Sequence, residues 1–131
     1  TASGYDPRGA AFLSIDTSIG SGDEIEIRFE MPIRILRAHP KVKGHAGKVT
    51  VTRGPLVFCL ENLDNPDVDI FNVQMDPSSL QAESTPDLLD GMVKLTCRSM
   101  DGLPLTLIPY MLWGNSGTSQ MTVWINTGKE A

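Results

Sequence analysis

The chain has 131 residues, of which 40% are hydrophobic and 21% charged, proportions that are ordinary for a water-soluble protein of one domain. No apolar run approaches the roughly 20 residues of a membrane-spanning helix, so we expect no membrane partner. A formal net charge of -5 at pH 7 argues against a nucleic-acid partner, because such proteins favour basic patches that release counterions from phosphate.

The first third of the chain predicts a loop followed by short β-strands. Residues 1–9 are rich in glycine, proline and small polar residues, which indicates a leading loop. Alternation of apolar residues then predicts a strand over 10–15 and a clearer one over 24–30, separated by turn residues at 20–23. The strand over 24–30 is expected to place one face on a core and the other in water.

The middle of the chain continues the pattern of strands and turns. Strands are predicted over 33–38 and 48–52, and a continuously apolar strand is predicted over 56–60. Because both faces of such a strand should be covered, we expect it at the centre of the sheet. A further strand is predicted over 70–75, followed by a long loop-like connection over 76–90.

The last third of the chain predicts two hairpins. Strands over 93–98 and 103–107 flank Asp101-Gly102, a typical hairpin turn. The stretch from Ile108 to Ile125 holds both tryptophans and predicts a second, buried hairpin that turns over 115–119. The sequence therefore predicts an all-β fold: a single antiparallel, jelly-roll-like β-sandwich domain over residues 1–131, with about nine short strands.

The cysteines and charged residues leave several interpretations open. Cys59 and Cys97 lie in apolar strand patterns and predict buried free thiols, with a disulfide between neighbouring strands as the alternative. Seven basic residues and one acid lie between Arg28 and Arg53, whereas eight acids and no base lie between Glu61 and Asp90. We expect two solvated faces, with a contact between complementary domains or subunits as the alternative.

No group of residues in the sequence assembles a recognisable site. His39 and His45 lack a second ligand pair at zinc spacing, and the acidic loop over 64–69 lacks the glycine and terminal glutamate of a calcium loop. Phosphate loops and nucleophile elbows are absent as well. Tyr110, Phe12 and the two tryptophans are able to stack on sugar rings, although core or interdomain packing is the more usual role of large aromatics.

Five groups of residues, in this order and spacing, resemble the C-terminal region of the β-L-arabinofuranosidases of glycoside hydrolase family 127. These groups are Gly22-Asp23, Met31-Pro32 with Arg34, Ala38-His39-Pro40 with Val42, Arg53 to Glu61, and Ile108 to Gly117. The resemblance covers roughly Gly9 to Ile125. Departures from the family pattern at Thr17, Ile19, Phe58, Met111 and Ser116 indicate a divergent member.

The resemblance implies a full-length enzyme with an (α/α)6-barrel catalytic domain followed by β-sandwich domains, to which this chain would belong. In such relatives the zinc-bound cysteine nucleophile and the acidic catalytic residues lie in the barrel, so we assign no catalytic, cofactor or metal residue here. The expected function is a non-catalytic accessory domain of an enzyme acting on L-arabinofuranosides or related plant sugars. An independent carbohydrate-binding module is the alternative.

The resemblance also suggests partners and contact residues. The expected partners are the barrel of the same polypeptide, a second copy of the chain in a homodimer and, for the alternative function, a glycan. The candidate interdomain or sugar-contact residues are Arg53, Tyr110, Trp113, Asn115 and Trp124. Because the chain begins at Thr1 without a basic-then-apolar leader, we expect a piece of a longer polypeptide or a processed product, and the compartment stays open.

Overall fold

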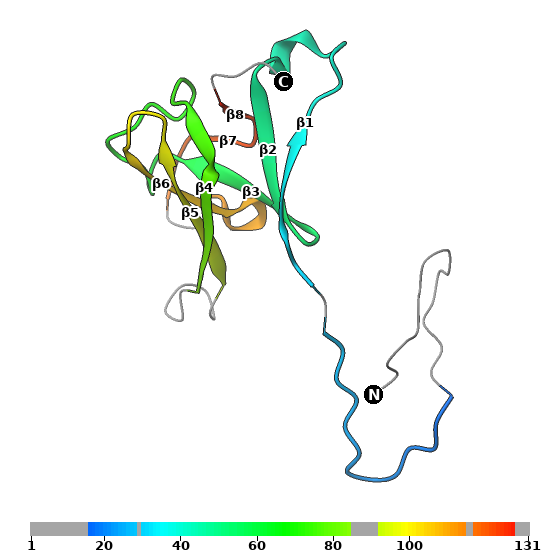
Figure 1. The fold of residues 1–131 in the computed structure, drawn as a ribbon. Coiled ribbons are helices and arrows are strands. Elements are labelled where there is room, and N and C mark those ends of the chain that lie inside the picture. Colours follow the sequence, from blue (N-terminus) through cyan, green and yellow to red (C-terminus); the bar gives the residue numbers. More distant parts are fainter. Residues whose placement is uncertain (1–15, 29, 85–91, 115–116, 128–131) are drawn as a thin grey trace.

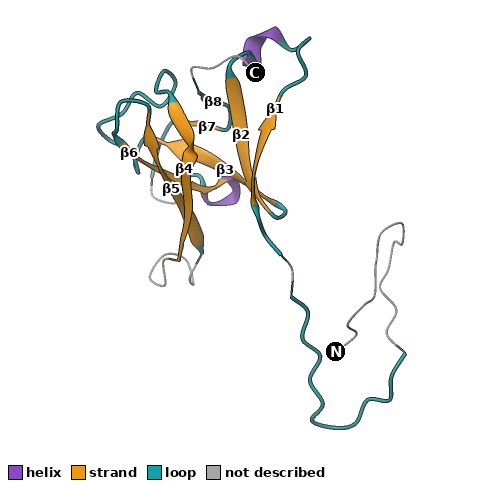
Figure 2. Ribbon diagram, viewed as in Figure 1, coloured by secondary structure: helices purple, strands orange, loops and turns teal. Residues whose placement is uncertain are grey.

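The computed structural model describes residues 16–28, 30–84, 92–114 and 117–127, and this part of the chain is all-β, as predicted (Figures 1 and 2). It contains eight strands and two one-turn 3-10 helices. The strands are β1 (Ile33–Arg37), β2 (Lys48–Arg53), β3 (Leu56–Glu61), β4 (Met75–Ser84), β5 (Val93–Ser99), β6 (Pro104–Pro109), β7 (Met121–Thr122) and β8 (Ile125–Asn126). The 3-10 helices are η1 (Lys43–His45) and η2 (Tyr110–Leu112).

The strands form one curled antiparallel sheet with the order β1-β2-β3-β6-β5-β4. Two short C-terminal strands add to it from outside this path, because β7 pairs with β3 and β8 pairs with β2. A parallel bridge between Gln74 and Asn126 brings the start of β4 against β8. The sheet therefore curls on itself like a half-barrel (Figure 1).

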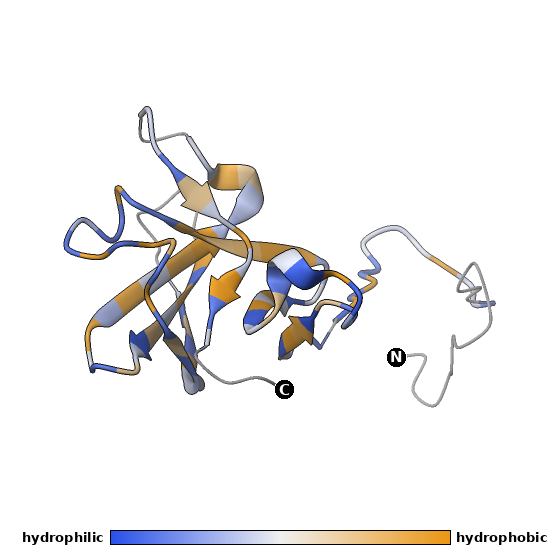
Figure 3. Cartoon of the chain, turned by 90° about the horizontal axis from the view of Figure 1, so that it is seen from above, coloured by the Kyte–Doolittle hydropathy of each residue, from blue (hydrophilic) through white to orange (hydrophobic). Residues whose placement is uncertain are grey.

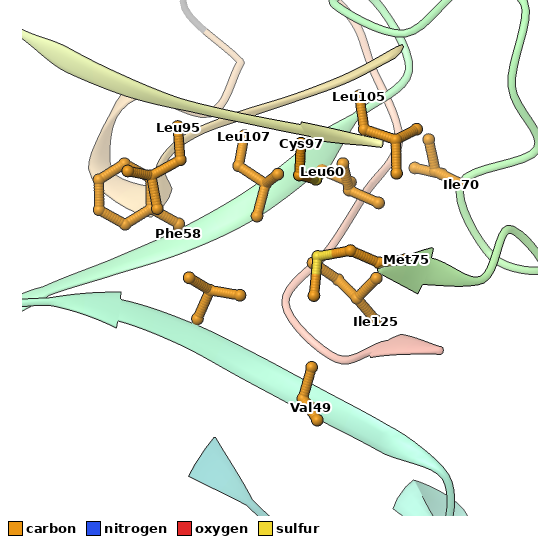
Figure 4. Packing of buried hydrophobic residues seen from close by; sticks show 11 residues of the cluster. Val49, Phe58, Leu60, Ile70, Met75, Leu95, Cys97, Leu105, Leu107 and Ile125 are labelled. Carbon is orange, nitrogen blue, oxygen red and sulfur yellow. The ribbon is translucent and has the colours of Figure 1, made fainter. Parts of the chain in front are cut away.

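The apolar side chains inside the curl form one core (Figure 4). Alternate residues of β2, β5 and β6 point into it, which is the period of two that the sequence shows. In β3, the three consecutive residues Phe58, Cys59 and Leu60 are all 0% exposed, since both edges of the strand are paired and both faces are covered. The predicted central place of this strand is confirmed.

The hairpin of β5 and β6 is also confirmed. Gly102 takes a positive φ of 87°, which glycine adopts without the steric cost of a Cβ. The Ser99 amide donates to the Leu103 carbonyl at 2.8 Å, and the Gly102 amide donates to the Ser99 carbonyl at 2.9 Å. Local turn chemistry and alternation suffice here because the two strands are neighbours both in sequence and in the sheet.

The predicted strand over 24–30 is wrong as a part of this sheet. Residues 16–28 belong to no strand of the described chain and run outside the sheet (Figure 1). Ile25 and Ile27 are 57% and 59% exposed, so their side chains reach no core. The leading loop over 1–9 and the predicted strand over 10–15 lie outside the described residues, as does Phe29.

The prediction of a strand over 70–75 and a loop over 76–90 is displaced by several residues. Residues 70–72 form a turn, and β4 runs from Met75 to Ser84. A proline and serines are tolerated in it because β4 is an edge strand, paired with β5, with a register shift between Asp76 and Gln81. The Ser79 hydroxyl accepts a hydrogen bond from the Arg98 amide at 2.8 Å within this irregular part.

The predicted hairpin over 108–125 is wrong in its pairing. After Pro109 the chain enters η2, and β7 returns to β3 rather than to β6. Leu60 is paired with Leu107 on one edge and with Thr122 on the other, so β3 separates the two segments. Turn residues predict a reversal of direction, but they do not determine which strand edge the returning segment meets.

Candidate functional site

Two exposed aromatic residues of the described chain lie together on η2 and the residue after it. We call Tyr110, Met111 and Trp113 the η2 surface; their exposed fractions are 47%, 58% and 42%. The Trp113 amide donates to the Tyr110 carbonyl at 3.0 Å, and in a 3-10 turn residues three apart lie above one another. The Tyr110 and Trp113 rings consequently stack, with centroids 6.4 Å apart and planes 22° apart.

The η2 surface lies near the point where the N-terminal segment joins the sheet. Pro109 pairs with Phe58, which places η2 beside the first half of β3, next to the β2–β3 turn. Met31 packs on the same turn, since a Cβ on Gly54 would lie 2.9 Å from the Met31 Cε. One end of the domain thus carries both the exposed aromatic residues and the connection to the upstream segment.

The predicted contact residues do not form one site. Tyr110 and Trp113 come together, and their exposure excludes core packing, whereas the interdomain packing expected as the other role stays a prediction. Arg53 is half-buried at the end of β2 near the turn, paired with Ile33 and Leu56. Trp124 is half-buried between β7 and β8, near the opposite end of β2. Asn115 lies outside the described residues.

Trp124 has a structural partner in the chain itself. Its indole stacks on the His45 imidazole, with centroids 4.5 Å apart and planes 15° apart. Its carbonyl accepts a hydrogen bond from the Thr122 hydroxyl at 2.7 Å. This tryptophan therefore connects η1 with the C-terminal segment.

A shallow hollow of about 400 Å³ lies between the β3–β4 loops and the segment before β7. Its lining includes Asn62, Phe71 and Gln120. The Phe71 ring is 48% exposed, which sequence reasoning missed. The sequence holds no signal for this exposure, because it predicts a strand over 70–75. The Asp69 carboxylate, also in the lining, accepts hydrogen bonds from the Phe71 amide and the Asn72 side chain, so it stabilises the loop itself.

The second hollow, of about 230 Å³, lies at the tip of the β1–β2 hairpin and is basic, with Arg37, His39, His45 and Lys48 in its lining. The six lysine and arginine residues of the hairpin meet no acid within it, because residues 33–53 contain no aspartate or glutamate. The basic and acidic stretches of the sequence thus lie on separate elements of the fold.

A buried carboxylate lies at the end of β3. Glu61 is 1% exposed and accepts a hydrogen bond from the Ser119 hydroxyl at 2.5 Å. Burial raises the pKa of Asp64, and the charge of Glu61 raises it further. Asn65 is buried beside them, and its side-chain amide forms hydrogen bonds with three backbone groups of Glu61 and Thr106.

Both cysteines are free and buried, so the disulfide alternative is wrong and the prediction of buried thiols is confirmed. They lie on β3 and β5, with β6 between these strands. Burial raises the pKa of each thiol to about 12, with smaller contributions from nearby carboxylates. Neither thiol is therefore ionised near neutral pH, which is the opposite of what a thiolate nucleophile requires.

The described residues include no group of three or more histidine, cysteine, aspartate or glutamate side chains placed to share a metal ion. Among the same residues, no helix has the length and apolar character needed to cross a membrane.

Comparison with known families identifies the family of this chain. The model of the glycoside hydrolase family 127 C-terminal domain matches residues 33–126. The chain belongs to this family. Its similarity to the C-terminal region of the family, expected from the sequence, is thus confirmed, and the match begins at the first residue of β1.

Individual relatives agree with this family. A non-reducing end β-L-arabinofuranosidase of Bifidobacterium longum is 31% identical over 133 residues, covering 81% of this chain and 20% of the relative. The crystal structure of a GH127 β-L-arabinofuranosidase from Geobacillus stearothermophilus T6 gives a TM-score of 0.66 at 35% identity, covering 75% of this chain and 18% of that one. A further GH127 β-arabinofuranosidase structure gives a TM-score of 0.58 at 33% identity, covering 75% and 17%. The chain thus spans about a fifth of the length of these relatives.

Proposed function

We propose that the chain is the non-catalytic C-terminal accessory domain of a glycoside hydrolase that acts on L-arabinofuranosides or related plant sugars. In this proposal the η2 surface packs against the catalytic barrel of the same polypeptide and helps to position it. The family membership and the fifth of the relatives' length that the chain spans support a catalytic domain elsewhere in the polypeptide.

The position of the η2 surface is the observation that carries the interdomain role. Exposed aromatic residues that gather at one site mark contact surfaces more often than solitary exposed residues do. The η2 surface lies at the same end of the domain as the turn on which Met31 packs, and therefore near the segment that leads upstream. A domain joined through that segment has a high effective concentration at this surface.

The chemistry of this chain favours a non-catalytic role. The zinc centre with a cysteine nucleophile that the resemblance implies requires clustered thiolate and acidic ligands. Cys59 and Cys97 do not fit it, because both are buried and their pKa values are raised to about 12. We therefore place the zinc and the reaction in another domain of the natural polypeptide.

The test compares the isolated chain with the natural polypeptide, each carrying Tyr110→Ser and Trp113→Ser. We expect the isolated chain to keep its unfolding midpoint, because the replaced side chains are exposed. In the natural polypeptide we expect a lower inactivation temperature with an aryl β-L-arabinofuranoside as substrate. The matched control is Phe71→Ser, an equally exposed aromatic on the loop before β4, which should change neither quantity.

Two results would overturn the proposal. The first is hydrolysis of that substrate by the isolated chain, abolished by a substitution within it. The second is an inactivation temperature of the natural polypeptide that is unchanged by the double substitution.

A carbohydrate-binding module is a second candidate, favoured by the near-parallel Tyr110 and Trp113 rings. Two exposed stacked aromatics offer a sugar ring an apolar platform. Titration with plant arabinan or arabinogalactan would then quench the tryptophan fluorescence of the isolated chain, and Trp113→Ser would abolish the response. A flat titration removes this candidate.

We also propose a homodimer that covers the open edge of β1. Among the described strands, β1 pairs only with β2, and Ile35 and Leu36 are exposed beside the free edge. Such an edge is a template for pairing with a second chain across a two-fold axis. Sedimentation equilibrium at micromolar concentration tests this: a monomer near 14.3 kDa at all concentrations contradicts it.

A further inference from the structure

The segment before the matched domain has the pattern of a β-strand but no sheet to join in the described chain. Residues 16–28 are exposed throughout and run away from the body of the domain (Figures 1 and 3). Ile25 and Ile27 alternate with Glu24, Glu26 and Arg28, and the two isoleucines are more than half exposed. Large β-branched residues in strict alternation with charged ones are typical of a strand with one buried face.

Local hydrogen bonds within this segment are compatible with a strand that follows a turn. The Arg28 Nε donates to the Glu26 Oε1 at 2.6 Å, so two residues separated by one lie on the same polar face, as in a strand. Before them, the Asp23 amide donates to the Gly20 carbonyl at 3.2 Å, and the Gly20 amide donates to the Asp23 carboxylate at 2.7 Å. Gly22 has a φ of 88°, which completes a tight turn.

The segment does not pair with the sheet of its own domain, although one edge of β1 is free among the described strands. Met31 is fixed over Gly54, and two residues later Ile33 is paired with Arg53, so β1 starts directly after the segment. Residues 16–28 leave from this point in the direction away from the sheet rather than folding back along β1 (Figure 1). The isoleucines therefore need a surface that another part of the polypeptide supplies.

The matched family domain is described as a C-terminal one, and the segment precedes it. The family match begins at residue 33, which leaves the segment outside the domain. The similarity to the Bifidobacterium longum relative covers 81% of the chain, a larger share than residues 33–131 make up. The relative therefore has a counterpart of residues upstream of β1, and about four fifths of its length lies beyond the aligned part.

We propose that residues 23–28 form a β-strand of the preceding domain, added to the edge of a sheet in that domain with Ile25 and Ile27 in its core. Met31-Pro32 is then the boundary, where Pro32 ends the strand because it lacks an amide hydrogen. The C-terminal domain would thus be tied to its neighbour by backbone hydrogen bonds as well as by a linker. The inference rests on the proposed function in one respect, namely that the natural polypeptide continues upstream with a further domain.

Hydrogen exchange of the natural polypeptide and of the isolated chain tests this strand. In the isolated chain we expect the amides of residues 24–28 to exchange at the rate of unstructured peptide. In the natural polypeptide we expect the alternate amides that donate to the neighbouring strand to exchange at least about a hundredfold more slowly, because ladder amides open only with their sheet. Ile25→Asp with Ile27→Asp should remove this protection while the β5 and β6 amides keep theirs.

The control variant is Ile19→Asp, which changes an equally exposed isoleucine on the other side of the turn. It should leave the protection of residues 24–28 intact. Fast exchange of these amides in the natural polypeptide overturns the inference. This outcome is independent of the effect of Tyr110→Ser with Trp113→Ser, so the strand over 23–28 and the interdomain role of the η2 surface are tested separately. Protection that appears in the isolated chain and rises with its concentration also overturns it, because the partner is then a second copy.

Discussion

The imidazole of His45 and the indole of Trp124 stack with 4.5 Å between their centroids and 15° between their planes. His45 ends η1 at the tip of the β1–β2 connection, whereas Trp124 lies between the two last strands. Next to this pair, the Thr127 amide donates to the Gly47 carbonyl at 3.0 Å. The stack therefore joins the basic hairpin to the C-terminal segment that completes the curl of the sheet.

His45→Ala should lower the free energy of unfolding by about 1 kcal/mol, because an aromatic stack contributes this much beyond the area it buries. Urea denaturation followed by far-UV circular dichroism measures the change. The matched control is Tyr110→Ala, which removes the wider and more exposed stack on Trp113 and should cost less than about 0.5 kcal/mol. Equal losses of unfolding free energy in the two variants would show that the His45 stack contributes no more stability than the exposed Tyr110 stack.

Local sequence signals predicted the parts of the fold that depend on local pairing. The β5–β6 hairpin follows from alternation on both sides of Asp101-Gly102, and the central place of β3 follows from its unbroken apolar run. Both features are confirmed. In each case the chemistry that determines the structure lies within about a dozen residues of the chain.

The incorrect predictions concern features of the fold that depend on contacts between residues far apart in the sequence. The alternation over 24–30 predicts a strand, yet residues 24–28 belong to no strand of the described structure. The return of β7 to β3 instead of β6 depends on which edge remained open, which no local turn signal contains. β4 was missed because an edge strand tolerates the Pro77 and serine residues that usually indicate a loop.

The candidate site was also predictable only in part, because the sequence identifies its residues but not their exposure. Tyr110 and Trp113 were named from the sequence, but their exposure was not, because large aromatics are buried more often than not. Their pairing follows from a 3-10 turn that only the structure reveals. Phe71 was overlooked, since a single aromatic in a polar loop predicts neither burial nor exposure.

Gly54→Ala should destabilise the domain by about 1–2 kcal/mol, because Gly54 has a φ of 57° and its new Cβ would lie 2.9 Å from the Met31 Cε and 3.0 Å from its Cγ. Gly47→Ala is the control, since its φ is 71° but no atom lies within 4 Å of the added Cβ. We expect Gly54→Ala to cost more than the control by chemical denaturation. Adding Met31→Ala should remove this excess, and an excess that persists would mean that Met31 is not its cause.

Asn65→Ala should cost about 2–4 kcal/mol, because the change leaves buried backbone groups without partners. The Asn65 side-chain amide donates to the carbonyls of Glu61 and Thr106 at 2.9 Å each, and its oxygen accepts from the Thr106 amide at 2.8 Å. Asn72→Ala removes an exposed amide bonded to Asp69 and should cost less than about 0.5 kcal/mol. If the two variants unfold at the same urea concentration, the buried amide does not stabilise the β3–β4 loop as we infer.

The two buried thiols should make the domain less stable as the pH rises above 9. Burial raises the pKa of Cys59 and of Cys97 from 9.0 to about 12, so the folded state keeps both thiols protonated over a range in which the unfolded state ionises them. The unfolded state therefore binds fewer protons between pH 9 and about 12, and by linkage the free energy of unfolding falls with rising pH across this window. Below pH 9 the thiols should add no pH dependence.

Urea titrations at pH 8 and pH 10 measure the effect, and the double variant Cys59→Ala with Cys97→Ala separates it from lysine and tyrosine titration, which both proteins share. We expect a smaller loss of stability between the two pH values in the double variant. An identical loss in both proteins, or rapid labelling of the native thiols by a disulfide reagent at pH 8, would contradict the raised pKa values.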